Sequence, residues 1–144
     1  MIITQKLLNR HIESLFDMIS ETFIPDEIIG VKNGGFYLSK PLSLLFNKPH
    51  KEIYVSFYED DKCFDNPRRS EFIELDKNKK YLICDDLIDR GLTINYIREN
   101  YSGFNVKVAT VLQNKKATER ADFFADYYDG NWVTFPDDIL QRYC

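Results

Sequence analysis

The stretch that decides the fold is residues 81–93, Tyr-Leu-Ile-Cys-Asp-Asp-Leu-Ile-Asp-Arg-Gly-Leu-Thr. Its first four residues form a short apolar run, which is typical of a buried strand in a parallel sheet. Asp85 and Asp86 end this strand, and Gly91 and Thr93 begin a helix whose apolar residues follow at helical spacing. The stretch therefore predicts a strand, a glycine turn and a helix in direct succession.

A junction of this kind is suited to bind phosphate. Free backbone N–H groups at the start of a helix and the positive end of the helix dipole both face the anion. Acids beside such a site are expected where a divalent cation or sugar hydroxyls are bound as well, so the combination indicates a phosphorylated sugar. The alternative is an ordinary turn whose acids only cap the helix.

The rest of the chain alternates predicted helices and strands, which favours an α/β fold with a parallel sheet. We expect helices over residues 4–23 and 93–101 and another that ends near residue 46, and strands over residues 27–31, 51–58, 71–75, 81–84, 107–112, 123–127 and 132–135. Ligands of such sheets bind beyond the carboxyl ends of the strands. The turns after Val31, Cys84 and Leu112 should therefore share one edge of the sheet.

Two segments carry more specific expectations. In the helix that ends near residue 46, Leu38, Leu42 and Leu45 should face inward, and Pro41 implies a late start or a kink. Residues 59–70 are polar and charged and contain a proline, which predicts a mobile loop.

Composition limits the functional classes. A chain of 144 residues is long enough for one domain with a substantial core, spanning residues 1–144. Its net charge of −4 argues against a nucleic-acid-binding surface, and no apolar run is long enough for a membrane span. Three scattered cysteines predict reduced thiols in the cytoplasm, and two isolated histidines argue against zinc.

Residues 85–93 resemble the phosphoribosyl-diphosphate (PRPP) signature of type I phosphoribosyltransferases, usually two acids, two apolar residues and Asp-Thr-Gly-x-Thr. The match includes the acids, the glycine and the last threonine, whereas Arg90 stands where the family has threonine. The resemblance covers about residues 26–138. It implies the type I phosphoribosyltransferase fold, a parallel-sheet α/β fold with a small hood, here a flexible loop over residues 59–70.

The resemblance also implies roles for the residues of this stretch. Asp85 and Asp86 would hold the ribose hydroxyls of PRPP and bind Mg²⁺ indirectly, since magnesium prefers few carboxylates together with substrate oxygens. Asp89 would lie near N7 of a purine and act as general base or acid. The 5′-phosphate would be bound by Arg90, Gly91, Leu92 and Thr93, mainly through backbone N–H groups.

Residues 30–35, Gly-Val-Lys-Asn-Gly-Gly, resemble the pyrophosphate loop of the same family, in which an arginine precedes two glycines. The resemblance assigns pyrophosphate binding to Lys32, Asn33 and Gly34 and implies a cis peptide between Lys32 and Asn33. Asn33 replaces the arginine, so Lys32, or Arg68 and Arg69 from the predicted loop, would supply the positive charge. Without the resemblance, an ordinary strand-to-helix turn explains the glycine pair equally well.

Residues 132–138, Trp-Val-Thr-Phe-Pro-Asp-Asp, resemble the Trp-Ile-x-x-Pro-Trp-Asp/Glu segment of xanthine–guanine phosphoribosyltransferases. The resemblance implies that Trp132 stacks on the purine, that Val133 offers its carbonyl, and that Asp138 belongs to the base site. The alternative is a tryptophan in the hydrophobic core. Lys115 lies about one position from the expected lysine that donates to a 6-oxo group, and Asn114 could present an amide there instead.

These resemblances predict an enzyme that transfers a phosphoribosyl group from PRPP to a purine base, favouring a 6-oxopurine, with Mg²⁺ as cofactor and a homodimer or higher homo-oligomer as assembly. The products would be a nucleoside 5′-monophosphate and pyrophosphate. The main alternative is a regulatory module of the same fold that binds PRPP or nucleotides without catalysis. A receiver domain is a poorer match, because its acidic pair lies near the N-terminus.

Overall fold

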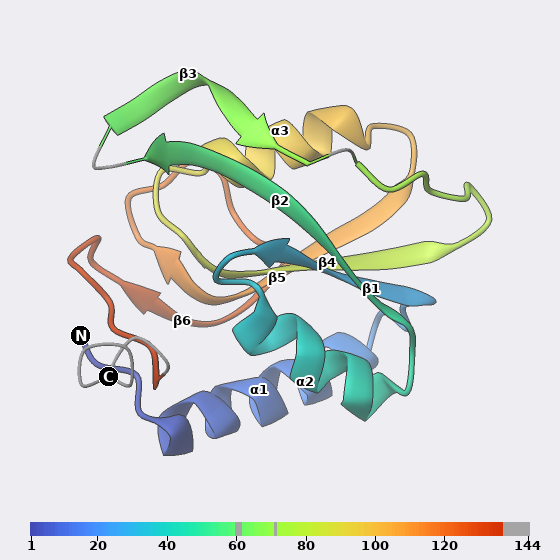
Figure 1. The fold of residues 1–144 in the computed structure, drawn as a ribbon. Coiled ribbons are helices and arrows are strands. Elements are labelled where there is room, and N and C mark those ends of the chain that lie inside the picture. Colours follow the sequence, from blue (N-terminus) through green and yellow to red (C-terminus); the bar gives the residue numbers. More distant parts are fainter. Residues whose placement is uncertain (60–61, 71, 137–144) are drawn as a thin grey trace.

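The chain forms a six-stranded sheet with helices on both faces (Figure 1). The structure is a computed structural model that describes residues 1–59, 62–70 and 72–136, with the side chains of all of these except 58, 59 and 62–65. The elements in chain order are α1 (Gln5–Ser20), β1 (Glu27–Lys32), α2 (Phe36–Phe46), β2 (His50–Glu59), β3 (Lys62–Arg69), β4 (Lys80–Ile88), α3 (Leu92–Asn100), β5 (Asn105–Asn114) and β6 (Phe123–Tyr128).

The sheet has the strand order β3-β2-β1-β4-β5-β6. All neighbouring strands are parallel except β2 and β3, which pair antiparallel. The mostly parallel sheet confirms the predicted α/β class. It also brings the carboxyl ends of β1, β4, β5 and β6 to the same edge, where ligands of such sheets bind.

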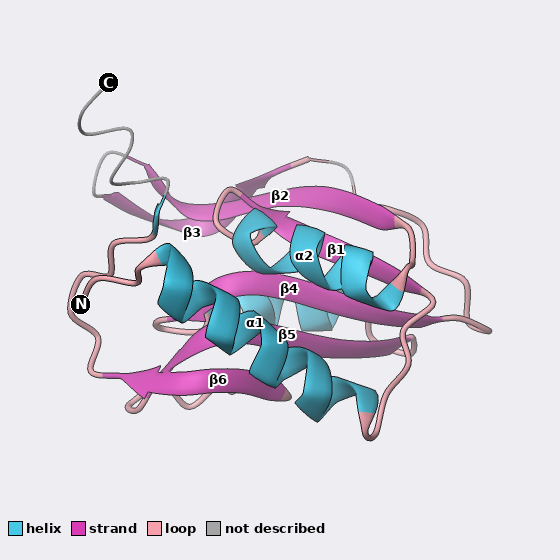
Figure 2. Ribbon diagram, turned by 90° about the horizontal axis from the view of Figure 1, so that it is seen from below, coloured by secondary structure: helices cyan, strands magenta, loops and turns pink. Residues whose placement is uncertain are grey.

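Helices α1 and α2 cover one face of the sheet and α3 covers the other (Figure 2). Strand β4 contributes to both layers, because successive side chains of a strand point to opposite faces. Leu82 and Cys84 pack under α1 and α2, whereas Tyr81 and Ile83 pack on the side of α3. Burial raises the pKa of the Cys84 thiol, so this cysteine is an inert part of the core.

Strand β4 is longer than the sequence predicted. It does not end at the two acids but continues to Ile88, because β5 pairs with it as far as Gln113. On its other side, the last pair with β1 joins Gly30 to Cys84. Asp85 and Asp86 therefore lie on a part of β4 that has left β1, and the sheet is open there.

The loop predicted over residues 59–70 is largely a strand instead, since Lys62–Arg69 forms β3 on the edge of the sheet. Edge strands are often rich in charge and contain proline, which protects them from pairing with other chains, and this composition resembles that of a loop. The guanidinium of Arg69 lies 5.0 Å from the ring centre of Phe72 and 5.9 Å from that of Tyr96. The hairpin is thereby packed against α3.

Two predicted strands are absent from the described residues. Residues 72–76 are irregular and are held by hydrogen bonds from the Tyr101 hydroxyl to Ile73 O and from Asp76 N to the Tyr81 hydroxyl. Residues 132–135 form only an isolated bridge between Thr134 and Ile2. The first segment is thus held by hydrogen bonds with tyrosine hydroxyls and the second by a single bridge, and neither forms a ladder with a neighbouring strand.

Helix α2 runs without a late start from Phe36 through Pro41, and its buried face differs from the predicted one. Leu38 and Leu42 are fully buried, but Leu45 is 48% exposed. Ser39 and Ser43 take the place of an apolar side chain, with hydroxyls bonded to His50 Nε2 and to Lys40 O. Because these small residues face the sheet, the helix is rotated about its axis relative to the predicted orientation, and Leu45 points outward.

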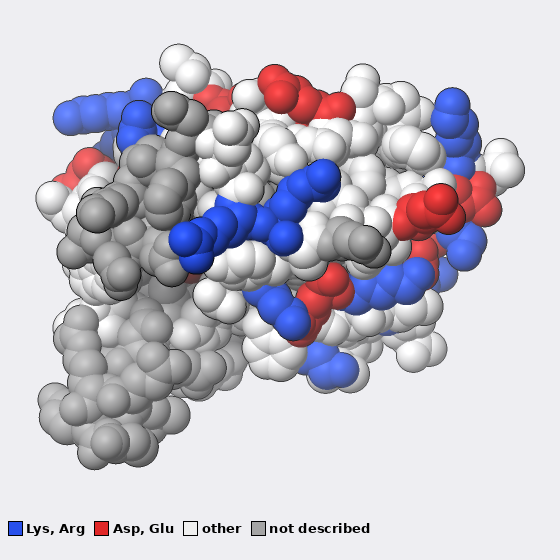
Figure 3. All heavy atoms as spheres, turned by 45° about the horizontal axis from the view of Figure 1, so that its top comes forward, with Lys and Arg blue, Asp and Glu red and all other residues white. Residues whose placement is uncertain are grey.

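The face that carries β3 and α3 has basic and acidic side chains interspersed rather than one field of a single sign (Figure 3). Among the described residues, no helix combines the length and the apolar character needed to cross a membrane.

Replacing Leu38 by alanine should lower the free energy of unfolding by about 2–5 kcal/mol, because it leaves a cavity between α2 and the sheet. The matched control is Leu44→Ala in the same helix, where the side chain is 68% exposed and the change should stay within about 0.5 kcal/mol. Urea unfolding followed by circular dichroism measures both. Equal losses would contradict the packing of α2.

Candidate functional site

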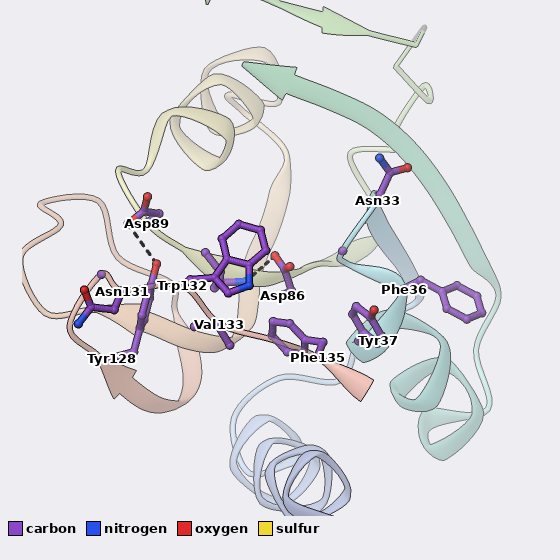
Figure 4. Close-up of a pocket in the computed structure, with 13 residues that line it drawn as sticks. Asn33, Phe36, Tyr37, Asp86, Asp89, Tyr128, Asn131, Trp132, Val133 and Phe135 are labelled. Atoms are coloured by element: carbon purple, nitrogen blue, oxygen red, sulfur yellow. Dashed lines mark hydrogen bonds between the residues drawn. The ribbon is translucent and has the colours of Figure 1, made fainter. Parts of the chain in front are cut away.

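The carboxyl edge of the sheet holds a cavity of about 730 Å³ (Figure 4). It is formed by the loop after β1, the start of α2, the end of β4 and the segment after β6. The lining residues are Asn33, Gly34, Phe36, Tyr37, Asp86, Leu87, Asp89, Tyr128, Gly130, Asn131, Trp132, Val133 and Phe135. Segments from four parts of the chain thus converge beyond the strand ends, as predicted for the turns after β1 and β4.

One wall of this cavity is aromatic. Tyr37 and Phe135 stack with ring centres 5.0 Å apart and an angle of 16° between the rings. Trp132 is 75% exposed and stands over the cavity near Asp86 (Figure 4). The alternative of a tryptophan in the core is therefore wrong, and the wall offers flat apolar surfaces to a planar ligand.

A smaller cavity of about 160 Å³ lies beside the first and is lined by residues 85–94. Gly91 has φ +85°, the left-handed conformation that glycine adopts at low cost, and it immediately precedes α3. A Cβ atom at this position would lie 2.4 Å from Cβ of Glu119. Both the positive φ and the close approach of Glu119 therefore require glycine at this position. The N–H groups at the start of α3 lie at the end of this cavity.

Asp85 and Asp86, in the last part of β4, are held by the backbone next to them. Asp86 N donates to Asp85 Oδ1 and Leu87 N donates to Asp86 Oδ1, each at 2.8 Å. Burial raises the pKa of Asp85 well above its ordinary value, and the adjacent negative charge of Asp86 raises it further. A bound cation or hydrogen-bond donors would relieve this repulsion.

The loop after β1 packs directly against Asp86. A Cβ atom at Gly34 would lie 2.2 Å from Asp86 Oδ2, so any side chain here would displace the Asp86 carboxylate. The peptide between Lys32 and Asn33 is cis, which confirms the expectation from the resemblance. Lys32 Nζ lies 3.1 Å from Glu52 Oε2, so its charge is already paired.

Asp89 follows β4 and lies where the two cavities meet. Its Oδ1 accepts hydrogen bonds from Asn114 Nδ2 at 3.0 Å and from the Tyr128 hydroxyl at 3.1 Å. Tyr128, Tyr37 and Phe135 were not predicted as site residues from the sequence. The one signal for Tyr128 is its place at the carboxyl end of a parallel strand.

Other predicted residues are placed differently. Lys115 is exposed and does not line the larger cavity. Arg69, which was expected to supply positive charge to the pyrophosphate loop, stacks on the aromatic rings near α3. No lysine or arginine among the described residues lines the larger cavity. Arg90 and Thr93 line the smaller cavity. Asp138 lies outside the described residues.

The fold and the junction at residues 81–93 agree with a comparison between the whole sequence and profiles of known protein families. The profile of the family described as "Phosphoribosyl transferase domain" matches residues 2–139. The chain belongs to this family.

Relatives of this phosphoribosyltransferase-family protein include purine enzymes. It is 28% identical over 119 residues to the xanthine-guanine phosphoribosyltransferase of Idiomarina loihiensis, covering 81% of this chain and 73% of that protein. The structure of the purine phosphoribosyltransferase of Pyrococcus horikoshii superposes with a TM-score of 0.80 at 28% identity, covering 94% and 92% of the two chains. That of the Helicobacter pylori xanthine-guanine-hypoxanthine enzyme gives 0.82 at 15% identity, covering 99% and 95%.

Replacing Gly91 by alanine should destabilise the protein by more than the roughly 1–2 kcal/mol expected for a left-handed non-glycine residue, because the new Cβ also meets Glu119. Gly103→Ala is the matched control, since Gly103 has φ +89° and nothing within 4 Å of a Cβ. Thermal and urea unfolding compare the two variants. A loss at Gly91 no larger than at Gly103 would contradict the close packing of this loop.

Asp85→Asn should stabilise the metal-free protein at pH 7. Because the pKa of Asp85 is raised on folding, the native state binds more protons than the unfolded state, and stability falls as pH rises above the ordinary pKa of an aspartate. Asparagine keeps an acceptor for Asp86 N and removes this loss, so its advantage should shrink as pH falls towards 3.8.

Asp129→Asn is the control with the opposite sign. The hydrogen bond from Asn131 N lowers the pKa of this exposed aspartate. Removing the carboxylate charge should therefore destabilise the protein at pH 7 or leave its stability unchanged. Urea unfolding of the three proteins at several pH values measures both trends. A destabilised Asp85→Asn protein at pH 7 would show that the acidic pair does not oppose folding.

Proposed function

We propose that this protein transfers the phosphoribosyl group of PRPP to a purine base, in the manner of purine salvage enzymes. Membership of the phosphoribosyl transferase family and similarity to named purine enzymes support the proposal. The observation that carries it is the pair of adjoining cavities, one at the start of α3 and the other beneath an exposed tryptophan, with Asp86 and Asp89 lining both. A phosphorylated sugar and a planar base, joined at one carbon, need two such adjoining sites.

The chain's residues divide the work between the two cavities. Backbone N–H groups of residues 90–93, with the Thr93 hydroxyl, bind the 5′-phosphate at the start of α3. Asp85 and Asp86 accept hydrogen bonds from the ribose hydroxyls, and the loop at residues 32–34 binds the diphosphate. The base stacks on Trp132 and donates a hydrogen bond from its edge to the carbonyl of Val133.

The same residues suit a magnesium ion. No cluster of three or more histidine, cysteine, aspartate or glutamate side chains occurs among the described residues, so the protein alone does not complete a metal site. Magnesium is commonly held by one or two carboxylates together with substrate oxygens and water. When bound beside Asp85 and Asp86, it would supply positive charge to the diphosphate. Magnesium dependence and a cytoplasmic location belong to this proposal.

In the reaction, N9 of the base forms a bond to C1′ of the ribose while the bond from C1′ to the diphosphate oxygen breaks. The diphosphate leaves with the bonding electron pair, and Asp89 takes the proton from N7 of the base. The enzyme accelerates the reaction chiefly by holding base and sugar in line and by stabilising the charge of the leaving group. We propose a 6-oxopurine as the base, supported by the xanthine-guanine enzyme among the relatives.

Incubation with PRPP, MgCl₂ and one purine at a time tests the function. Hypoxanthine, guanine or xanthine should yield the corresponding 5′-monophosphate and an equal amount of pyrophosphate, and EDTA should abolish the reaction. Binding of PRPP without product from any purine would contradict the proposal and indicate a module that binds but does not catalyse.

Asp89→Asn should lower kcat by about 10²–10⁴-fold, since it removes the proton acceptor but keeps the shape of the side chain. The dissociation constant of PRPP, measured by calorimetry, should change little, because the sugar is bound by other residues. Asp126→Asn, at an exposed position of β6 outside both cavities, is the control. Equal losses of turnover and PRPP affinity would remove Asp89 from the proton transfer.

A further inference from the structure

We propose that Asn114 and Tyr128 are positioning residues that fix Asp89 so that only its Oδ2 atom faces the substrate. This inference rests on the proposed function, in which Asp89 exchanges a proton with the base. Both side chains donate to the same oxygen, Asp89 Oδ1, at 3.0 and 3.1 Å. Figure 4 shows the bond between Tyr128 and Asp89 at one end of the cavity.

The orientation of the Asn114 amide follows from its two contacts. Its Nδ2 donates to the carboxylate of Asp89, and its Oδ1 accepts from Lys116 N at 3.0 Å. The reverse orientation would place an oxygen against a carboxylate and an amino group against an N–H donor, so both hydrogen bonds would be lost. Asn114 is only 9% exposed, so water competes little for these two hydrogen bonds.

The two donors are held by neighbouring strands. Asn114 and Tyr128 are opposite each other in the last pair of β5 and β6, and the backbone of Lys115 donates to Tyr128 O at 3.1 Å. Asp89 follows directly after Ile88, the residue of β4 that pairs with Gln113 of β5. Both donors thus lie at the ends of adjacent strands, and the carboxylate lies one residue beyond the end of β4 beside them, so their mutual positions are set by the sheet.

This arrangement matters because Asp89 is an exposed side chain that would otherwise sample several rotamers. With both hydrogen bonds on Oδ1, rotation about the Cβ–Cγ bond would break the two together. Asp89 Oδ2 accepts no hydrogen bond from a described residue. It is therefore the oxygen that is available to a base under Trp132, and its direction is set before the base arrives.

The test separates action through Asp89 from a structural role. Tyr128→Phe removes only the hydroxyl, and Asn114→Asp keeps an acceptor for Lys116 N while replacing the donor. Each should lower kcat roughly tenfold to a hundredfold, as expected for a misplaced catalytic group, with little change in the KM of PRPP. Tyr127→Phe is the matched control, because its hydroxyl accepts from Arg120 and lies on the other face of the same strand.

A double-mutant cycle with Asp89→Asn decides the question. If the two donors act through Asp89, Tyr128→Phe should have no further effect on kcat in the Asp89→Asn protein. The same factor in both backgrounds, or a wild-type kcat for both single variants, would overturn the inference and leave the proposed function intact. A wild-type protein that makes no nucleotide would instead overturn the proposed function, and the inference with it.

Discussion

The site depends on the separation of β1 from β4. The two strands pair until Gly30 meets Cys84, after which β4 continues beside β5 alone. In the space that opens, the loop after β1 turns into α2 and brings Gly34 against the carboxylate of Asp86. If β1 and β4 remained paired to their ends, Asp86 would face a neighbouring strand and the larger cavity would not form. The residues proposed to bind the sugar and the diphosphate are placed by this divergence or by the turn into α3 that follows it, whereas Trp132 and Val133 come from the segment after β6.

The same geometry opposes the stability of the fold. Two adjacent carboxylates on a buried strand repel each other and lose hydration, which is why the pKa of Asp85 is raised. The protein limits the repulsion by donating backbone N–H groups to both side chains. Among the described residues, Arg90 is the one basic side chain that lines the smaller cavity, and no lysine or arginine lines the larger one. Such an arrangement is expected where binding rather than folding supplies the compensating charge, and it is a common source of conflict between activity and stability.

Much of the fold could be predicted because its central strands are apolar and regularly spaced, as in residues 81–84. Strand β3 escaped prediction because an edge strand may carry charges and a proline, like a loop. The buried face of α2 was misjudged because Ser39 and Ser43 are polar by type yet face the sheet with satisfied hydroxyls. In the site, the residues of a continuous motif, such as Asp86 and Gly91, could be found by resemblance. Tyr128 could not, and Asn114 was expected only as a partner of the base, because the contact of both residues with Asp89 arises from the register between β5 and β6 and from an approach across the sheet.

The charges of the site indicate how an anionic substrate can be bound by a protein with a net charge of −4. Lys32 is paired with Glu52, and Arg69 lies against aromatic rings near α3. Asn33 replaces the arginine that the resemblance expects, so the loop after β1 offers a diphosphate mainly N–H groups. In the proposed function the 5′-phosphate has a positive charge beside it, since Arg90 lines the smaller cavity and the N-terminus of α3 lies there. The two ends of the substrate should therefore depend on different charges: the phosphate on the protein, and the diphosphate on a divalent cation that binds with it. In this division the neutral amide of Asn114 is an advantage, because it orients Asp89 without adding a fixed positive charge that would weaken the carboxylate as a base.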